Sequence, residues 1–220
     1  MGEISICHGF VNLARQIFAA VENVDGSKGR MLYSCSEVRV IPSRDKCFAL
    51  LQENEVPGHI IQHSRVVHGV ALYLCRALIL HGAKLDRALV EAGSLLHDIT
   101  KMKSLEVGEG HPQSGAHLLS RLGYPQVAEI VRQHVVLDDG ISTGPVTEAA
   151  LVHYADKRVK HTTIVSLAER FRDLKERYGK TPPALAWLEN VEGKSLELEE
   201  RIFRELPIAP ESLASLVHVE

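Results

Sequence analysis

The stretch Leu95-Leu96-His97-Asp98-Ile99-Thr100-Lys101 places an imidazole next to a carboxylate, directly after an apolar segment with helical periodicity (88–96). Neighbouring imidazole and carboxylate side chains can both reach one cation if the end of that helix leaves them facing a cavity. A His-Asp pair alone is common and says little about function. Its weight comes from an ordered series whose members lie on or beside separate predicted helices. The series comprises His63, His97, Asp98, His111, His134 and Asp156. The sequence therefore indicates a candidate metal site assembled from several helices.

Helical signals follow one another along most of the chain. Ser43 is a candidate N-cap, Pro57 opens a long helix, and Gly82 is a natural C-terminal stop. The predicted helices cover 44–54, 57–81, 86–97, 112–122, 125–136, 146–160, 164–178 and 183–206, after a first helix at 4–24 and an extended connector at 31–41. Because strands and helices do not alternate, a Rossmann-type fold or a barrel is unsupported. We expect an all-α protein: an N-terminal helix and connector at 1–43, a core at 44–160, and C-terminal helices at 161–220 packed on that core.

The composition limits the class of protein. Hydrophobic residues make up 45% and charged residues 24% of the 220 residues, a globular balance that excludes a disordered chain and a fibrous rod. A chain of this length can bury an adequate core without disulfides or a structural metal, so a bound metal is expected to be functional. The formal net charge of −3 disfavours nucleic acid as a partner held by bulk positive charge.

The remaining composition signals concern the cellular compartment. The four cysteines are widely spaced and form no CxxC pair, which is typical of reduced thiols. No export signal is visible, and the longest apolar stretch, Val70 to Leu80, is interrupted by Arg76 and is too short to cross a bilayer. We therefore expect a cytoplasmic protein with no membrane partner; the sequence makes no prediction of its oligomeric state.

Several segments around the His and Asp series resemble the motifs of one family. They are His63-Ser-Arg-Val-Val, Leu96-His97-Asp98-Ile99-Thr100-Lys101, His111-Pro-Gln-Ser-Gly-Ala, Arg132-Gln-His134 and Tyr154-Ala155-Asp156-Lys157. Over about residues 44–160 the chain resembles the HD-domain superfamily of metal-dependent phosphohydrolases, in its HDIG-like branch. Thr100 replaces the glycine of the family's His-Asp-Ile-Gly-Lys signature. This departure bears on the local turn geometry more than on the metal-binding pair.

The resemblance implies a role for each residue of the series. It implies that one metal is held by His63, His97, Asp98 and Asp156, that Asp98 bridges to a second metal, and that His111 and His134 complete the second site. Four imidazoles and two carboxylates suit iron, manganese, nickel, cobalt or zinc, with magnesium also allowed. The sequence does not choose among these metals, nor between one ion and two.

The resemblance also implies a reaction. Metal ions lower the pKa of a bound water, so that hydroxide attacks the phosphorus of a phosphoester or phosphoanhydride, and the expected partner is a small phosphorylated substrate such as a nucleotide. Asp98 and Lys101 are the expected catalytic residues; Lys101 offers positive charge to a phosphate oxygen, and its alternative role is that of a solvated surface lysine. The motif order is similar to that of bacterial enzymes that split diadenosine tetraphosphate symmetrically, but the chain lacks an aromatic-rich pocket signal for two adenines.

Alternatives remain open at this stage. His59 and His63 are four residues apart and could form a helical metal pair of their own. His117 and His153 are each expected either to support a ligand or to lie in the core, the core being the simpler interpretation. For the whole protein, the alternative to an enzyme is a non-catalytic metal- or nucleotide-binding module with a sensing or assembly role. A role in nucleic-acid processing is disfavoured by the acidic balance.

Overall fold

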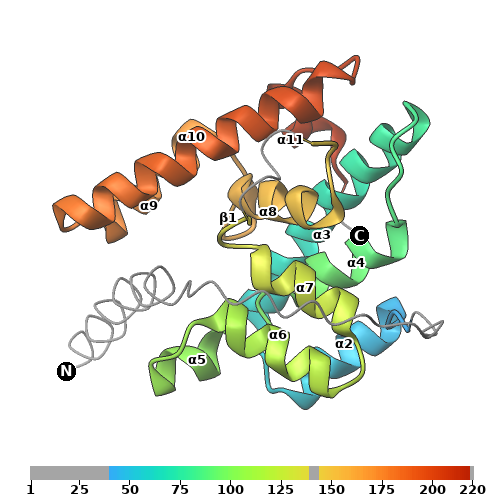
Figure 1. Ribbon diagram of the computed structural model, residues 1–220, viewed down its shortest axis with the longest axis vertical. Coiled ribbons are helices and arrows are strands. Elements are labelled where there is room, and N and C mark those ends of the chain that lie inside the picture. Colours follow the sequence, from blue (N-terminus) through green and yellow to red (C-terminus); the bar gives the residue numbers. More distant parts are fainter. Residues whose placement is uncertain (1–39, 139–143, 219–220) are drawn as a thin grey trace, which may run out of the picture.

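The computed structural model describes residues 40–138 and 144–218 of the chain, and over these ranges the protein is helical apart from one short hairpin (Figure 1). The helices are α2 (Arg44–Glu53), α3 (Gly58–Leu80), α4 (Arg87–Leu96), α5 (Lys101–Val107), α6 (His111–Arg121), α7 (Pro125–Gln133), α8 (Glu148–Lys157), α9 (Leu167–Tyr178), α10 (Pro182–Arg204), the 3-10 turn η1 (Pro210–Ser212) and α11 (Leu213–Leu216). The hairpin consists of β1 (Val159–Lys160) and β2 (Thr163–Ile164). The predicted all-α fold is confirmed. The helix expected at 4–24 and nearly all of the connector at 31–41 lie outside the described residues.

Several helices begin and end at the residues that the sequence marks as caps. Ser43 Oγ accepts a hydrogen bond from the backbone N–H of Lys46 at 3.3 Å, which confirms Ser43 as the N-cap of α2. Asp86 plays the same part for α4, since its Oδ1 accepts from the backbone N–H of Ala88 at 2.9 Å. After α3, Gly82 adopts a φ of +93°, a left-handed conformation that favours glycine and ends the helix.

The region after α8 differs from the sequence prediction. Helices were expected at 146–160 and 164–178, but a two-stranded antiparallel hairpin separates α8 from α9. Val159 pairs with Ile164, and Lys160 pairs with Thr163. These strands contain β-branched residues that favour extended backbone, and His161 turns the chain with a φ of +55°. Strands of two residues are too short to produce an alternating pattern that would predict them from the sequence.

Two smaller differences lie beside the candidate site residues. α7 ends at Gln133, so that His134 is its C-cap and not an interior residue of a helix reaching 136. α5 was not predicted as a separate helix. It begins at Lys101, shortly after the His-Asp pair. His97 is likewise the C-cap of α4. Both histidines thus lie at helix ends, where a side chain can turn away from its own helix toward a common point.

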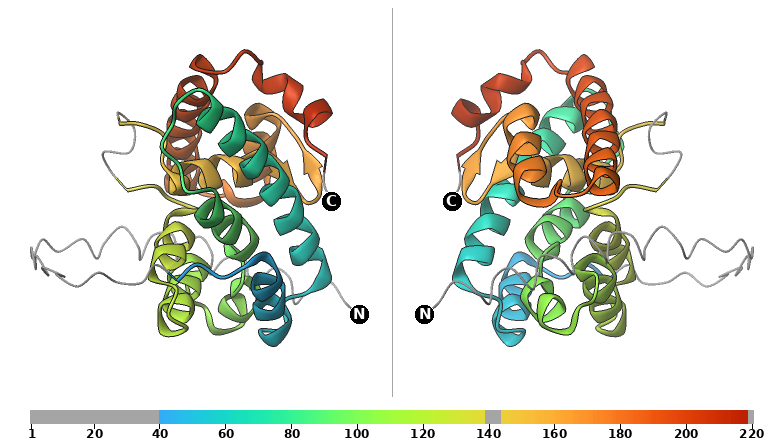
Figure 2. Two further views of the ribbon diagram at one scale, coloured as in Figure 1. Left: turned by 90° about the vertical axis from the view of Figure 1, so that its right-hand side faces the viewer. Right: turned by 90° about the vertical axis from the view of Figure 1, so that its left-hand side faces the viewer.

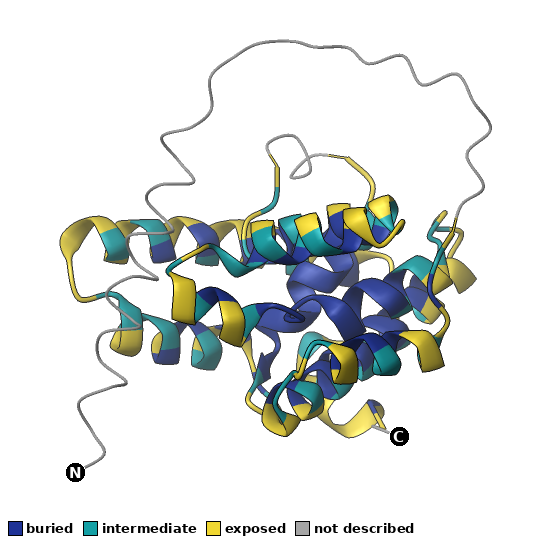
Figure 3. Cartoon of the chain, turned by 90° about the horizontal axis from the view of Figure 1, so that it is seen from below, coloured by how far each residue is buried: buried dark blue, intermediate teal, exposed yellow. Residues whose placement is uncertain are grey.

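The helices enclose two hydrophobic cores. One is formed by α3, α8 and the C-terminal helices and includes the fully buried Leu74 and Phe171. The other is formed by α2, α4, α6 and α7 and includes Leu50, Leu95 and Leu119. Figure 2 shows α2, α6 and α7 at one end of the molecule and α10 and α11 at the other, and Figure 3, seen from below, shows buried residues gathered toward the middle. Among the described helices, none is long and apolar enough to cross a membrane.

His68 is a buried histidine of α3 that contacts neither group of candidate ligands. Its Nδ1 lies 3.3 Å from the Ser94 hydroxyl. Burial, followed by the positive charges of Arg44, Arg76 and Arg87, lowers its pKa from 6.5 to about 4. His68 is therefore neutral in the folded protein, whereas in the unfolded chain it takes up a proton below about pH 6.5.

We expect acid to destabilise the fold through His68. Because the folded pKa is depressed, the unfolded state binds the proton more tightly, and stability is lost as the pH falls from about 6.5 toward about 4. Between about pH 7 and about pH 5, the free energy of unfolding of the wild type should fall by about 2 kcal/mol more than that of His68→Gln. Urea unfolding of both proteins at the two pH values measures this difference. Parallel pH profiles would contradict the assignment.

Candidate metal centre

Three of the candidate ligand histidines have one ring nitrogen fixed by a backbone carbonyl. The Nδ1 atoms of His63, His97 and His134 lie 2.7 Å, 2.8 Å and 2.6 Å from the carbonyl oxygens of His161, Ser94 and Val131, respectively. A carbonyl can only accept, so each Nδ1 must carry the proton and donate it. In the neutral ring, Nε2 is then left with a lone pair. This is the tautomer and the outer-shell bonding typical of histidines that bind metals.

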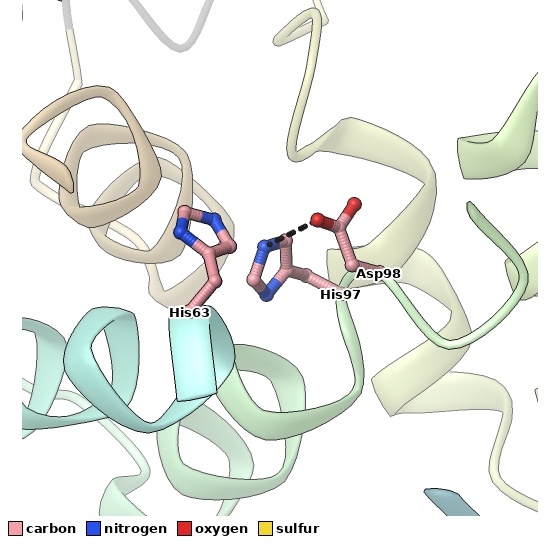
Figure 4. Close-up of side chains that lie close together, drawn as sticks. All are labelled: His63, His97 and Asp98. Atoms are coloured by element: carbon pink, nitrogen blue, oxygen red, sulfur yellow. Dashed lines mark ion pairs between the residues drawn. The ribbon is translucent and has the colours of Figure 1, made fainter. Parts of the chain in front are cut away.

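One group of donor atoms forms around His63 and His97. His63 Nε2 lies 3.1 Å from Asp156 Oδ1, and His97 Nε2 lies 3.7 Å from the same oxygen and 3.4 Å from Asp98 Oδ2. Donor atoms of His63, His97 and Asp98 all lie within 4.8 Å of one another. Figure 4 shows these three side chains pointing toward a common space from two separate segments of the chain.

A second group forms on the other oxygen of the same aspartate. Asp98 Oδ1 lies 3.3 Å from His111 Nε2 and 3.6 Å from His134 Nε2, and the two Nε2 atoms are 3.0 Å apart. Asp98 therefore stands between the groups, with one oxygen facing each. The structure brings all six residues of the predicted series together. His59, the alternative partner of His63, is exposed on α3 and belongs to neither group.

The donor set has unmet bonding capacity that a cation would satisfy. His97 Nε2 and Asp98 Oδ1 are buried and have no hydrogen-bond partner among the described residues. His134 Nε2 has no hydrogen to give in the tautomer that its Nδ1 bond fixes, although it lies 3.0 Å from another ring nitrogen. Buried polar atoms without partners are costly, and each one calls for an explanation. Imidazole nitrogens and carboxylate oxygens in these numbers fit a divalent transition metal.

The protonation states of His111, His134 and the two carboxylates suit the same interpretation. Burial lowers the pKa of His134 to about 4 and also lowers the pKa of His111, which keeps both rings neutral. Burial alone would raise the pKa of Asp98 and Asp156. The charges of neighbouring lysines and histidines outweigh it and hold both pKa values well below the usual range. Burial also disfavours the charged form of His97. The negative charges of Asp98 and Asp156 outweigh burial, and the pKa of His97 is raised.

Two lysines hold the two carboxylates. Lys101 Nζ lies 2.7 Å from Asp98 Oδ2, and with 34% of its side chain exposed it reaches solvent at the edge of the centre. Lys157 is buried; its Nζ donates to Asp156 Oδ2 at 2.8 Å and to the backbone oxygen of His134 at 3.2 Å. Sequence reasoning did not single out Lys157 as a residue of the site. The available signal was the apolar run Ala149-Ala150-Leu151-Val152 at the start of α8, a helix that is buried from Ala149 to Lys157.

The two histidines that the sequence left open, His153 and His117, differ in the structure. His153 is buried in α8, and its Nδ1 donates to the backbone oxygen of His134 at 3.0 Å, so it supports a candidate ligand. His117 was expected to be a supporting or core residue, but it is exposed on α6. The reason is that the buried face of α6 is formed by Pro112, Gly115 and Leu119, which places His117 on the opposite side of the helix.

Thr100, which stands where the family signature has glycine, fits its place without strain. Its φ is −108°, a value open to any residue, and its Oγ1 donates to the backbone oxygen of His111 at 3.0 Å. The threonine hydroxyl thus joins the turn after Asp98 to the first residue of α6. This bond couples the two segments that carry the second donor group.

Comparison with known proteins agrees with this geometry. The family model of the HD domain matches residues 60–172, more than half of the chain. The chain belongs to the HD domain family. Membership places it in a superfamily of metal-dependent phosphohydrolases, whose domains bind divalent metals. The matched range begins near His63 and ends within α9.

Two curated relatives are similar over about two thirds of the chain. A tRNA (cytidine(56)-2'-O)-methyltransferase of Picrophilus torridus is 28% identical over 149 residues, which cover 65% of this chain and 42% of that protein. An uncharacterized protein of Methanocaldococcus jannaschii is 27% identical over 154 residues, which cover 64% of this chain and 89% of that protein. The HD protein therefore spans less than half the length of the Picrophilus relative. No solved structure matched significantly.

We expect Thr100→Val to destabilise the protein, because the buried methyl that replaces the hydroxyl leaves the His111 carbonyl without this donor. The free energy of unfolding should fall by about 1–2 kcal/mol, the cost of an unmet buried hydrogen bond. Thr100→Ser, which keeps the hydroxyl, is the matched control and should stay closer to the wild type. Urea unfolding of the three proteins measures the effect, and a Thr100→Val protein as stable as the wild type would show that the bond contributes nothing.

Proposed function

We propose that this HD protein hydrolyses a phosphoester or phosphoanhydride bond of a small nucleotide with the help of one or two divalent metal ions. The observation that carries the proposal is the position of Asp98. A buried carboxylate whose two oxygens face two separate sets of imidazole nitrogens has the arrangement expected of a bridging metal ligand. Hydrogen bonds account for only part of this concentration of donor atoms, since His97 Nε2 and Asp98 Oδ1 have none among the described residues.

The residues would divide between the two sites as the donor groups do. His63, His97 and Asp156 would hold one ion, His111 and His134 the other, and Asp98 would belong to both. When bound, such ions lower the pKa of a water molecule and polarise a phosphoryl oxygen, which is the chemistry that phosphoester hydrolysis needs.

Other residues of the chain prepare the site for a phosphoryl group. Lys101, partly exposed and 2.7 Å from Asp98 Oδ2, can offer its ammonium group to a phosphate oxygen at the edge of the centre. Lys157 keeps the Asp156 carboxylate oriented, with Oδ2 on the ammonium group and Oδ1 toward the histidines. His153 and Lys157 fix the His134 peptide from the same side. These contacts hold the donors in place before a substrate arrives, which is the condition for electrostatic stabilisation without reorganisation.

The name of the Picrophilus relative raises tRNA as a second class of substrate. That name describes a protein more than twice as long as the matched segment. A net charge of −3 gives this chain no general attraction to a nucleic-acid backbone. A small nucleotide is therefore the substrate class that we propose, and tRNA belongs in the same substrate panel.

We expect Asp98→Ala to lose both bound metal and phosphate release while the helical fold survives. The loss of activity should be at least about a thousandfold, because the variant removes a ligand shared by both ions. Metal content is measured by elemental analysis. Phosphate release is measured on a panel of nucleotides with manganese, iron, nickel or magnesium, and the fold is checked by circular dichroism.

The histidine variants separate the two donor groups. His111→Ala and His134→Ala should each empty one site and leave the other, and His59→Ala, an exposed histidine on the same helix as His63, is the matched control. Retained activity in Asp98→Ala, or two metals per chain in the His111 and His134 variants, would refute the proposed site. Bound metal with no turnover on any substrate would favour a non-catalytic binding module.

A further inference from the structure

A cluster of charged side chains lies on the β1–β2 hairpin and along one face of α9. We name it the hairpin–α9 cluster; it consists of Lys160, His161, Arg170, Asp173 and Arg177. Asp173 is buried among the others. Its Oδ1 lies 3.0 Å from Arg177 Nε and 3.3 Å from Lys160 Nζ, and its Oδ2 lies 3.6 Å from Arg170 Nη1. Three cationic side chains therefore share one carboxylate.

The hairpin–α9 cluster contains hydrogen-bond donors and positive charge in excess of what Asp173 pairs with. Arg170 Nε is buried and has no hydrogen-bond partner among the described residues. Arg177 Nη2 lies 3.3 Å from His161 Nε2, a ring whose pKa is lowered by partial loss of hydration and then by the charges of Arg177 and Arg170. His161 is therefore neutral and does not offset the positive charge of the arginines. The side chains of Lys160 and Arg177 are 31% and 45% exposed, so the surplus charge can be reached from solvent.

The cluster borders the metal centre on two sides. The backbone oxygen of His161 accepts the hydrogen bond from His63 Nδ1 at 2.7 Å, so only the width of one imidazole ring separates the hairpin from the donor atom His63 Nε2. On the α9 side, the positive charge of Arg170 acts to lower the pKa of Lys101, against the carboxylates of Asp98 and Asp156, which raise it. Lys101 lies 2.7 Å from Asp98 Oδ2. The cluster therefore adds to the positive charge that Lys101 places at the edge of the centre.

This concentration of cations runs against the charge of the whole chain, which is −3. One phosphoryl group at the centre would need only the nearby Lys101. Additional cations beside it are suited to a ligand that carries several negative charges close together, because charge-assisted hydrogen bonds from arginine to phosphate oxygens are strong and geometrically specific. The phosphate groups of an oligophosphate chain meet this description.

We propose that the hairpin–α9 cluster binds the phosphate groups that lie beyond the scissile one, so that the substrate is a nucleotide with an oligophosphate chain. The assignment rests on the proposed function for the identity of the scissile group, but the anion-binding site itself does not. Arg170 and Arg177 are its principal donors, and Lys160 adds charge at its edge. A nucleoside monophosphate, with a single phosphate, would leave these donors unused.

An RNA backbone offers phosphates as well, but it spaces them one nucleotide apart, whereas these cations converge on a single carboxylate. The compactness of the cluster therefore favours a continuous phosphate chain. A short oligouridylate serves as the competing probe in the experiment.

The test measures binding of inorganic tripolyphosphate, orthophosphate and oligouridylate to the full chain by titration calorimetry. An excess of magnesium in all samples keeps chelation of metal by tripolyphosphate constant. Arg170→Gln and Arg177→Gln should each weaken tripolyphosphate binding about tenfold or more, with less than about a twofold change for orthophosphate. Arg172→Gln, an exposed arginine on the same helix, is the matched control and should bind tripolyphosphate like the wild type. Thermal unfolding checks that each variant is folded. Arg177→Gln changes a half-exposed side chain, so it still tests the proposal if Arg170→Gln fails to fold.

The proposal would be overturned by unchanged tripolyphosphate binding in both variants, or by an equal loss in the Arg172→Gln control. Weakened oligouridylate binding with unchanged tripolyphosphate binding would assign the cluster to RNA and would also overturn it. Because this titration needs no turnover, its failure is distinct from failure of the proposed hydrolase. A protein that hydrolyses no nucleotide can still bind tripolyphosphate through the cluster, and an active hydrolase can lack the site.

Discussion

The burial of the Asp98 carboxylate is the constraint on which the rest of the structure depends. An ionised carboxylate removed from water is costly unless positive charge or hydrogen-bond donors surround it. Here Lys101 lies 2.7 Å from one oxygen, and the other oxygen faces two imidazoles and has no hydrogen bond from the part of the chain that the structure describes. The helices that meet at this residue are therefore arranged around a group that needs cations.

Two of the histidines are oriented by hydrogen bonds to backbone carbonyls at the ends of helices. The last carbonyls of a helix have no partner within the helix. His97 follows α4 and donates to the carbonyl of Ser94, and His134 follows α7 and donates to the carbonyl of Val131, each three residues back along its own chain. The same bond satisfies a helix end and fixes a tautomer. His63, in the interior of α3, has no such free carbonyl beside it, and the β1–β2 hairpin supplies the oxygen of His161 instead.

Sequence reasoning reached the helices and the order of the donors because both depend on local signals. Ser43, Pro57 and Gly82 mark helix ends through backbone chemistry that acts within a few residues, and the His and Asp series is visible as a linear pattern. The hairpin and Lys157 were missed for a different reason. The turn at His161 and the burial of Lys157 are set by contacts with α3 and α7, and partners that are distant in sequence leave no mark on periodicity. In a sequence, a lysine that will be buried cannot be distinguished from an exposed one until its partners are known.

The location of the centre links it to the stability of the whole fold. His63 and Asp156 come from α3 and α8, which build the core shared with the C-terminal helices. His97, Asp98, His111 and His134 come from segments joined to α4, α6 and α7, which build the other core. The centre therefore lies where the two cores meet, and a cation held by both donor groups would tie one core to the other. Because a ligand that binds only the folded state stabilises it by mass action, metal binding and the mutual placement of the two cores should be thermodynamically coupled. The arrangement of the cores positions the donors, and a bound metal would in turn hold the cores in that arrangement.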